Sequence, residues 1–251
     1  MPAESNHPVF RAPDDLNIKI WRYMDLSKYV SLLDSSALYF SRADMLGDPY
    51  EGATSHANRE MWPQVYQGRI PISDLERMSS YHEFERQWTF INCWHMNEHE
   101  SAAMWKLYAR TCDAVAVQST YGRLHSELPA HTYVGMVDYM DYRTEWMPED
   151  NSFYRFMRKR KSFEHERELR ALTQHLPYAP DPNGGPFEVI TREQNHECGR
   201  LVPVRLAELL ERVYVAPTAP AWFLAIVQRI TARYGLNVAV DQSSLDSVPV
   251  F

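Results

Sequence analysis

Short segments in which apolar and polar residues alternate, or in which apolar residues run together, recur along the chain and predict β-strands. They cover residues 17–23, 37–40, 88–94, 114–118, 133–142, 212–215 and 237–241. Segments with the spacing of amphipathic helices lie between several of them, at residues 26–33, 102–108, 222–234 and around Leu124. These segments follow no strict strand–helix–strand rhythm. The sequence therefore predicts an α+β fold, with a mixed, mainly antiparallel central sheet and helices packed on it.

The 251 residues are enough for one domain with a sizeable core. Residues 1–16 contain three prolines and no apolar run, so we expect a flexible N-terminal arm. Residues 17–251 are expected to form a single α+β domain. The polar, helix-forming stretch at about 53–86 is expected to be an insertion over the core of that domain.

Composition and charge narrow the possible environment and partners. The net charge of −7 argues against a general nucleic-acid platform. Three widely spaced cysteines without a CxxC pair do not suit a disulfide framework, which favours a reducing compartment. No apolar run approaches the roughly 18 residues of a membrane span. We expect a cytoplasmic protein without a membrane partner.

Charged residues concentrate between Arg155 and Arg170, the leading candidate for the chemical centre. Helix propensity and pairs four residues apart, such as Glu166 with Arg170, are typical of a solvated helical face. The alternative is a strand that starts near Glu166, which would place Glu166, Glu168 and Arg170 on one face. Two carboxylates beside an arginine suit the stabilisation of an electron-poor sugar carbon. Spacing alone does not choose between helix and strand.

The four consecutive cations Arg158 to Lys161 form a basic island in this acidic chain. They can be the solvated edge of a helix. They can also contact the phosphates of a dinucleotide or a nucleic acid.

Residues 95–99 read H-x-x-E-H, the arrangement of inverted zinc peptidases. On a helix, His95 and His99 would share one face and could bind Zn²⁺ while Glu98 activates water. Glu166 or Glu168 could supply a third ligand. The pattern directly follows a predicted strand, however, and does not lie within a clear helix.

Several short motifs occur in an order that resembles a known family. They are Trp21-Arg22-Tyr23, Leu38-Tyr39-Phe40, Asp48-Pro49-Tyr50-Glu51, Cys93-Trp94, Trp105 with Tyr108, Val115 to Val117, and Phe163 with Glu166, Glu168 and Arg170. Together, over roughly residues 18–175, they resemble the uncharacterised bacterial domain-of-unknown-function family 2971. That family implies no established activity.

The chain is similar, more distantly, to the ADP-ribosyltransferase superfamily. There, an Arg or His on the first core strand binds NAD, a strand-then-helix unit packs an aromatic residue on nicotinamide, and a late Glu-x-Glu serves the transferred ribose. Arg22, the unit at 90–108, and Glu166-Arg167-Glu168 occur in that order. Asn92-Cys93-Trp94 departs from the pattern, because it stands where Ser-Thr-Ser is expected.

This second resemblance implies an ADP-ribosyltransferase-like core, NAD as substrate and no metal. Glu168 would bond the ribose hydroxyl, and Glu166 would position the acceptor. The residues implied to bind the cofactor are Arg22, Tyr23, Trp94, Trp105 and Arg170, with Trp94 or Trp105 stacked on nicotinamide.

Three functions follow as hypotheses. The first is an ADP-ribosyltransferase-like enzyme or an NAD glycohydrolase, of the kind used by toxins and phage-defence effectors. The second is a zinc-dependent hydrolase that uses His95, Glu98 and His99. The third is a non-catalytic module that binds nucleotides or nucleic acid through residues 158–161. The sequence does not define whether an acceptor is a protein or a nucleic acid.

Overall fold

A computed structural model describes residues 3–4, 6–108, 113–179, 188–191 and 193–246. Within these ranges, nine strands form the central sheet: β1 (Lys19–Asp25), β2 (Ala37–Arg42), β3 (Thr89–Met96), β4 (Ala114–Thr120), β5 (Tyr133–Met136), β8 (Glu168–Gln174), β11 (Gly199–Pro203), β12 (Arg212–Val215) and β13 (Ala239–Gln242). The strand order is β11-β2-β3-β1-β4-β12-β13, and β8 pairs with β3 and β5. Every pair in this sheet is antiparallel except β12 with β13. The predicted mixed, mainly antiparallel sheet is confirmed.

The sheet splits along β3. One edge of β3 pairs with β8 over its whole length, from Thr89 opposite Gln174 to His95 opposite Glu168. The other edge is shared: its first half pairs with β2 and its last residues pair with β1. Among the described residues, 92–94 have no ladder partner on this second edge, so β1 and β2 diverge there. This divergence opens the sheet beside the charged residues of β8.

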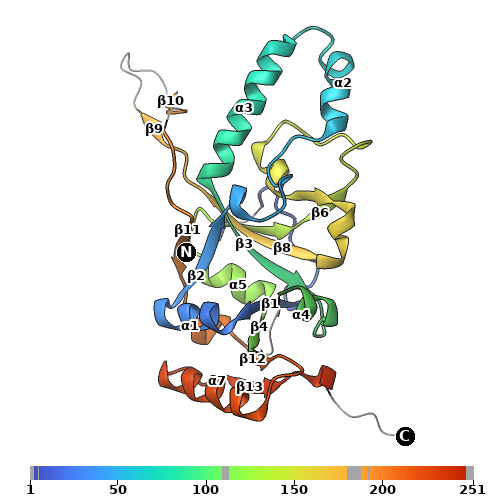
Figure 1. The fold of residues 1–251 in the computed structure, drawn as a ribbon. Coiled ribbons are helices and arrows are strands. Elements are labelled where there is room, and N and C mark those ends of the chain that lie inside the picture. The colour runs from blue at the N-terminus through green and yellow to red at the C-terminus, as the bar shows by residue number, and fades with distance from the viewer. Residues whose placement is uncertain (1–2, 5, 109–112, 180–187, 192, 247–251) are drawn as a thin grey trace, which may run out of the picture.

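Helices cover both faces of the sheet (Figure 1). On one face, α1 (Leu26–Ser35), α5 (Tyr121–Glu127), α6 (Leu206–Leu209) and α7 (Ala221–Arg233) bury apolar residues in the largest core cluster. The sequence offers Asp25 or Ser27 as the N-cap of α1, and it is the Asp25 side chain that accepts a hydrogen bond from the Lys28 N–H. On the other face, α4 (Ala102–Tyr108) packs Met104 and Trp105 against β1 and β4.

The predicted helical insertion contains α2 (His56–Tyr66) and α3 (Ile72–Trp88), which rise from the sheet at the top of Figure 1. Beneath them lie the short helices η1 (Ala43–Met45), η2 (Ser152–Phe156) and η3 (Lys161–Glu166), and a small parallel pair, β6 (Asp138–Met140) with β7 (Arg158–Arg160). Ala43, Phe156 and Met157 pack on Ile91 and Leu172 of the sheet. This lobe carries most of the polar residues discussed below.

Two local predictions need correction. Helix propensity alone favours one helix over residues 153–163. The segment is instead divided among η2, β7 and η3, because carboxylates of other elements hold Lys159 inward. The alternating stretch 133–142 is not one strand. It divides into β5 of the central sheet and β6 of the small one.

The described residues of the expected flexible arm pack against the domain. Phe10 stacks on Tyr133 of β5, with ring centroids 4.9 Å apart. The N–H of Met136 donates to the backbone oxygen of Arg11 at 2.9 Å, and Ala3 is buried. This segment therefore covers the outer end of β5.

Away from the core, β9 (Tyr178–Ala179) pairs with β10 (Glu188–Val189), and η4 (Ser244–Asp246) follows β13. Among the described helices, none combines the length and apolarity that crossing a membrane requires.

Candidate functional site

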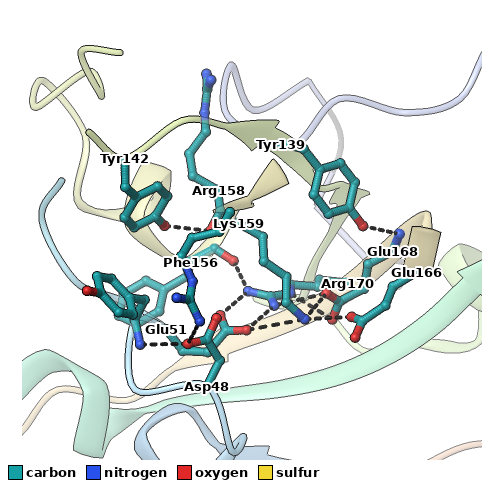
Figure 2. Close-up of polar contacts among 12 residues, drawn as sticks. Asp48, Glu51, Tyr139, Tyr142, Phe156, Arg158, Lys159, Glu166, Glu168 and Arg170 are labelled. Atoms are coloured by element: carbon teal, nitrogen blue, oxygen red, sulfur yellow. Dashed lines mark hydrogen bonds and ion pairs between the residues drawn. The ribbon is translucent and has the colours of Figure 1, made fainter. Parts of the chain in front are cut away.

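Arg170 is the most enclosed charged side chain of the site. It lies on β8 without solvent exposure. Its Nε and Nη2 donate to the two oxygens of Glu168 at 2.9 and 3.0 Å, and its Nη1 and Nη2 donate to the two oxygens of Glu51, both at 2.7 Å. Nη1 also donates to the backbone oxygen of Phe156 at 2.5 Å (Figure 2). All five guanidinium N–H groups therefore have acceptors, and Arg170 has no unused donor for a ligand.

Lys159 joins the same cluster from β7 and connects three carboxylates. Its Nζ lies 2.6 Å from Glu166, 3.2 Å from Glu168 and 3.6 Å from Glu51. Figure 2 shows its ammonium group beside the Arg170 guanidinium, with the acidic side chains around both. We call Glu51, Lys159, Glu166, Glu168 and Arg170 the ion cluster. It holds three carboxylates against two cations, so one negative charge is left over.

The backbone between the two glutamates turns sharply. Strand β8 starts at Glu168, while Glu166 ends η3, so the predicted strand face that holds Glu166, Glu168 and Arg170 is correct only for the last two. Arg167 between them is left-handed, with φ of 40°. That conformation is strained for a residue with a Cβ. It lets Glu166 reach Lys159 from η3 while Glu168 reaches it from the sheet.

The carboxylates of the ion cluster differ in how many contacts they make. Glu168 accepts three N–H bonds through its two oxygens, and Glu51 accepts two. Glu166 accepts one, at Oε2, and the described residues offer its Oε1 no hydrogen-bond donor. Burial raises the pKa of Glu168, but Arg170 and Lys159 outweigh it and lower that pKa to about 2. Glu168 is therefore a fixed anion, and Glu166 is the carboxylate with free capacity.

The basic island of residues 158–161 is neutralised by acids from other segments. Arg158 lies 3.4 Å from Asp138, Arg160 lies 2.8 Å from Asp48, and Lys161 pairs with Glu145. With Lys159 inside the ion cluster, each of the four cations has an acidic partner. The run does not present a free row of positive charge.

A cavity of about 810 Å³ lies beside the ion cluster, where β1 and β2 diverge. Its lining includes Arg22, Tyr23, Trp94, His95, Glu166 and Glu168. Trp21 pairs with His95, and His95 pairs with Glu168, so these three lie on one face of the sheet. Arg22 starts from the opposite face and reaches the cavity through the split.

Arg22 is the cation of this cavity that has no acidic partner among the described residues. Its Nη2 donates to the backbone oxygen of Tyr39 at 3.2 Å. Burial lowers its pKa to about 10, which leaves it protonated at neutral pH. A desolvated guanidinium without a counter-ion is suited to binding an anion such as a phosphate.

The aromatic candidates have internal partners. The Tyr23 hydroxyl accepts the Ser101 N–H at 2.9 Å, and its ring meets Trp105 edge-on at 4.9 Å. Trp105 is buried and donates to Glu100 at 3.0 Å, and it does not line the cavity. Trp94 is also buried, but it does line the cavity, with its indole N–H donating to Asn92 at 2.6 Å. Of the two tryptophans, Trp94 is the one that a ligand could reach.

Cys93 lies opposite Arg170 on the cavity side of β3. Burial, together with the charge of Glu168, raises its pKa well above the ordinary value. It is therefore a thiol at neutral pH and a poor nucleophile.

The H-x-x-E-H segment does not form the predicted helical metal site. His95 is at the end of β3, whereas Glu98 and His99 are exposed in the following loop, so the two histidines do not share a helix face. The described residues contain no group of three His, Cys, Asp or Glu side chains placed to hold a metal ion. Instead, His95 Nδ1 lies 2.5 Å from the backbone oxygen of Glu166.

The sequence did not indicate that Lys159 and Glu51 are central members of the ion cluster. Lys159 stood within a run of four cations, and nothing in that run distinguishes the buried one. Glu51 flanks a proline turn in the sequence, which suits either a loop-stabilising role or a place at the rim of a site. Its motif with Asp48 was a usable signal, because both acids of that turn pair with cations of the 158–170 segment.

No protein-family model, curated protein or solved structure matches this chain. The fold and site define it as an α+β protein with a split, mainly antiparallel sheet and a buried ion cluster beside a cavity.

Proposed function

We propose that this chain cleaves the nicotinamide–ribose bond of NAD, as an ADP-ribosyltransferase or an NAD glycohydrolase with an ADP-ribosyltransferase-like core. The observation that carries the proposal is that Arg22, a cation without an acidic partner among the described residues, lines the same cavity as the carboxylates Glu166 and Glu168. NAD has the matching polarity, since it joins anionic phosphates to a ribose that becomes positively charged as nicotinamide leaves. A cavity of about 810 Å³ is within the usual range for a cofactor site.

Each group has a defined task in this proposal. Arg22 holds phosphate oxygens by charge-assisted hydrogen bonds. The free oxygen of Glu166 accepts a ribose hydroxyl and stabilises the oxocarbenium-like state as the C–N bond breaks. Lys159 fixes the other oxygen of Glu166 at 2.6 Å, so that the carboxylate is pre-positioned.

The two glutamates therefore have other roles in this proposal than the ADP-ribosyltransferase resemblance implies. Glu168 has its two oxygens occupied by Arg170 and Lys159, so it positions these cations rather than the ribose. Glu166 takes the contact with the sugar. Trp94 is the candidate for packing on nicotinamide, because Trp105 is turned toward Glu100 and away from the cavity lining.

The two rival functions gain less support from the structure. A nucleic-acid surface at residues 158–161 would need free cations, and each of these has an acidic partner. A zinc hydrolase would need His95 and His99 on one helix face, and they lie on a strand and a loop.

The test is release of nicotinamide from NAD by the purified chain, followed by chromatography. Wild type is expected to turn over NAD, and Glu166→Gln is expected to reduce turnover by a factor of about 10² or more. Arg22→Gln is expected to raise KM for NAD, whereas the matched loss of charge in Arg212→Gln, at an exposed position of β12, leaves kcat and KM unchanged. Absence of turnover by wild type, with water and with protein or nucleic-acid acceptors, would refute the proposal.

Cleavage of the cellular NAD pool is what connects this activity with a toxin or phage-defence role. Expression of wild type in a bacterial host is expected to arrest growth and lower NAD, and Glu166→Gln is expected to do neither.

A further inference from the structure

His95 is a buried histidine with one nitrogen occupied and one unoccupied. Its Nδ1 lies 2.5 Å from the backbone oxygen of Glu166, and because a carbonyl only accepts, Nδ1 must carry the proton. In the neutral ring this leaves Nε2 as an acceptor. Nε2 is buried, and no described residue donates a hydrogen bond to it. His95 itself is 7% exposed and lines the cavity.

The groups around His95 keep its ring neutral. Burial lowers its pKa, and although the hydrogen bond to the Glu166 carbonyl opposes this, the charges of Arg167 and His165, both next to Glu166 in the chain, add to the lowering. Trp21 lies across from it on β1, Glu168 lies across from it on β8, and the Tyr23 ring lies 6.4 Å from its own. An unprotonated Nε2 with a fixed tautomer has the form of a general base.

The other groups of the cavity are less suited to accept a proton. Burial lowers the pKa values of Lys159 and Arg170, but the surrounding carboxylates outweigh it and raise both, so the two groups stay protonated. Burial raises the pKa values of Tyr23 and Tyr108, so both remain protonated as well. Glu168 is already fixed by two cations. Glu51 is held in the same way by Arg170, so among the described residues of the cavity only Glu166 competes with His95, and Glu166 is engaged by Lys159.

We propose that Nε2 of His95 is the general base that takes the proton from the incoming acceptor, which is water in hydrolysis or a hydroxyl in transfer. This inference rests on the proposed cleavage of NAD. As the ribose C1–N bond breaks, its electron pair stays with the nicotinamide nitrogen, which leaves neutral. The acceptor oxygen forms the new bond to C1, and its proton passes to Nε2 and then to solvent. In this proposal, Glu166 stabilises the positively charged ribose and His95 activates the acceptor.

The deciding variant is His95→Asn. An Asn amide can donate to the Glu166 carbonyl from near the Nδ1 position, but it has no basic nitrogen in place of Nε2. We expect kcat for NAD to fall by a factor of about 10²–10³, with KM changed by less than about threefold.

In wild type, kcat is expected to fall at acidic pH as a single group with a pKa below the ordinary 6.5 becomes protonated, and His95→Asn is expected to lose this dependence. Imidazole added to His95→Ala is expected to restore part of the turnover. His99→Asn, in the exposed loop, is the control and should retain both turnover and pH profile.

The outcomes separate the two proposals. If His95→Ala loses turnover but His95→Asn keeps it, His95 only positions Glu166 and the base role is refuted. If wild type cleaves NAD and His95→Asn matches it in rate and pH profile, the base role is likewise refuted while the proposed function stands. If wild type releases no nicotinamide, both fail together.

Discussion

Arg170 and Glu51 face each other as a double ion pair, with Nη1 and Nη2 of the guanidinium each 2.7 Å from one carboxylate oxygen. Glu51 belongs to the loop before α2, and Arg170 belongs to the central sheet. The pair therefore fastens the helical lobe to the sheet beside the cavity. Since Glu51 and Arg170 are 3% and 0% exposed, solvent cannot replace either partner.

Removing the charge of Glu51 should destabilise the fold. In Glu51→Gln, Arg170 stays buried with one of its two carboxylates missing, and we expect the free energy of unfolding to fall by about 3–5 kcal/mol. Urea unfolding at pH 7 measures this. Glu197→Gln breaks an exposed pair with Arg200 and should cost less than about 1 kcal/mol. Equal effects of the two variants would contradict a central role for the buried pair.

Acid should weaken the protein through Glu168. Although burial raises its pKa, Arg170 and Lys159 bring that pKa down to about 2, below the ordinary 4.5. A carboxyl with a depressed folded-state pKa stabilises the fold above its unfolded pKa, and that stability is lost as pH falls toward 2. We expect this group to remove roughly 3 kcal/mol of unfolding free energy between pH 5 and pH 2.

Urea unfolding over that pH range compares wild type with Glu168→Gln, which lacks the titrating group and should show a shallower loss. A carbon NMR titration of the wild-type Glu168 carboxyl gives an independent reading. A midpoint near 4.5 would contradict the expected depression.

Gly135 on β5 should be intolerant of a side chain because the N-terminal segment packs on it. A Cβ at Gly135 would lie 2.7 Å from the Cα of Phe10, and backbone atoms cannot move aside as the end of a flexible side chain can. We expect Gly135→Ala to lower the free energy of unfolding by about 1–3 kcal/mol. Gly235→Ala is not a matched control, because Gly235 has a positive φ. Gly122→Ala, whose Cβ would keep 3.2 Å from its nearest atom, is the milder comparison, and an equal cost there would argue against a specific contact with Phe10.

Alternation of apolar residues was enough to predict most of the sheet. Residues 212–215, 114–118 and 37–40 lie in β12, β4 and β2, because each strand has an apolar core face and little competing helix signal. Helix propensity, by contrast, gave a wrong prediction for residues 153–163. There, Arg and Lys favour a helix locally, but Lys159 contacts its three carboxylate partners as part of β7. Glu51 is distant in the sequence, and Glu166 and Glu168 come near only because the chain turns between β7 and β8.

The candidate site was predictable only in part. The two-residue period of a strand placed Glu168 and Arg170 on one face of β8, as the structure has them. Arg22 and Glu166, which the sequence offered only through the order of its motifs, line one cavity. The turn that holds Asp48 and Glu51 could mark Glu51 as a candidate, but no local pattern indicates its partner Arg170, 119 residues away. The free nitrogen of His95 could not be predicted either, because it depends on a hydrogen bond to a backbone oxygen 71 residues away.

Replacing Glu166 or Glu168 by glutamine should have different effects on stability and on catalysis. Among the described residues, Glu166 accepts one hydrogen bond, from Lys159, and its side chain is 13% exposed, so Glu166→Gln should cost about 1–2 kcal/mol of stability. Glu168 is held by Arg170 and Lys159 in the interior, so Glu168→Gln should cost about 3–5 kcal/mol. Under the proposed function, the variant with the smaller loss of stability, Glu166→Gln, should show the larger loss of catalysis at a temperature where both variants are folded. Glu166→Gln should lose kcat at nearly constant KM, because it removes an interaction that strengthens in the transition state, while folded Glu168→Gln should retain more of its rate. Thermal unfolding and nicotinamide release on the same samples provide both measurements. If Glu168→Gln is the less active variant while folded, the sugar contact belongs to Glu168, and Glu166 is the positioning residue.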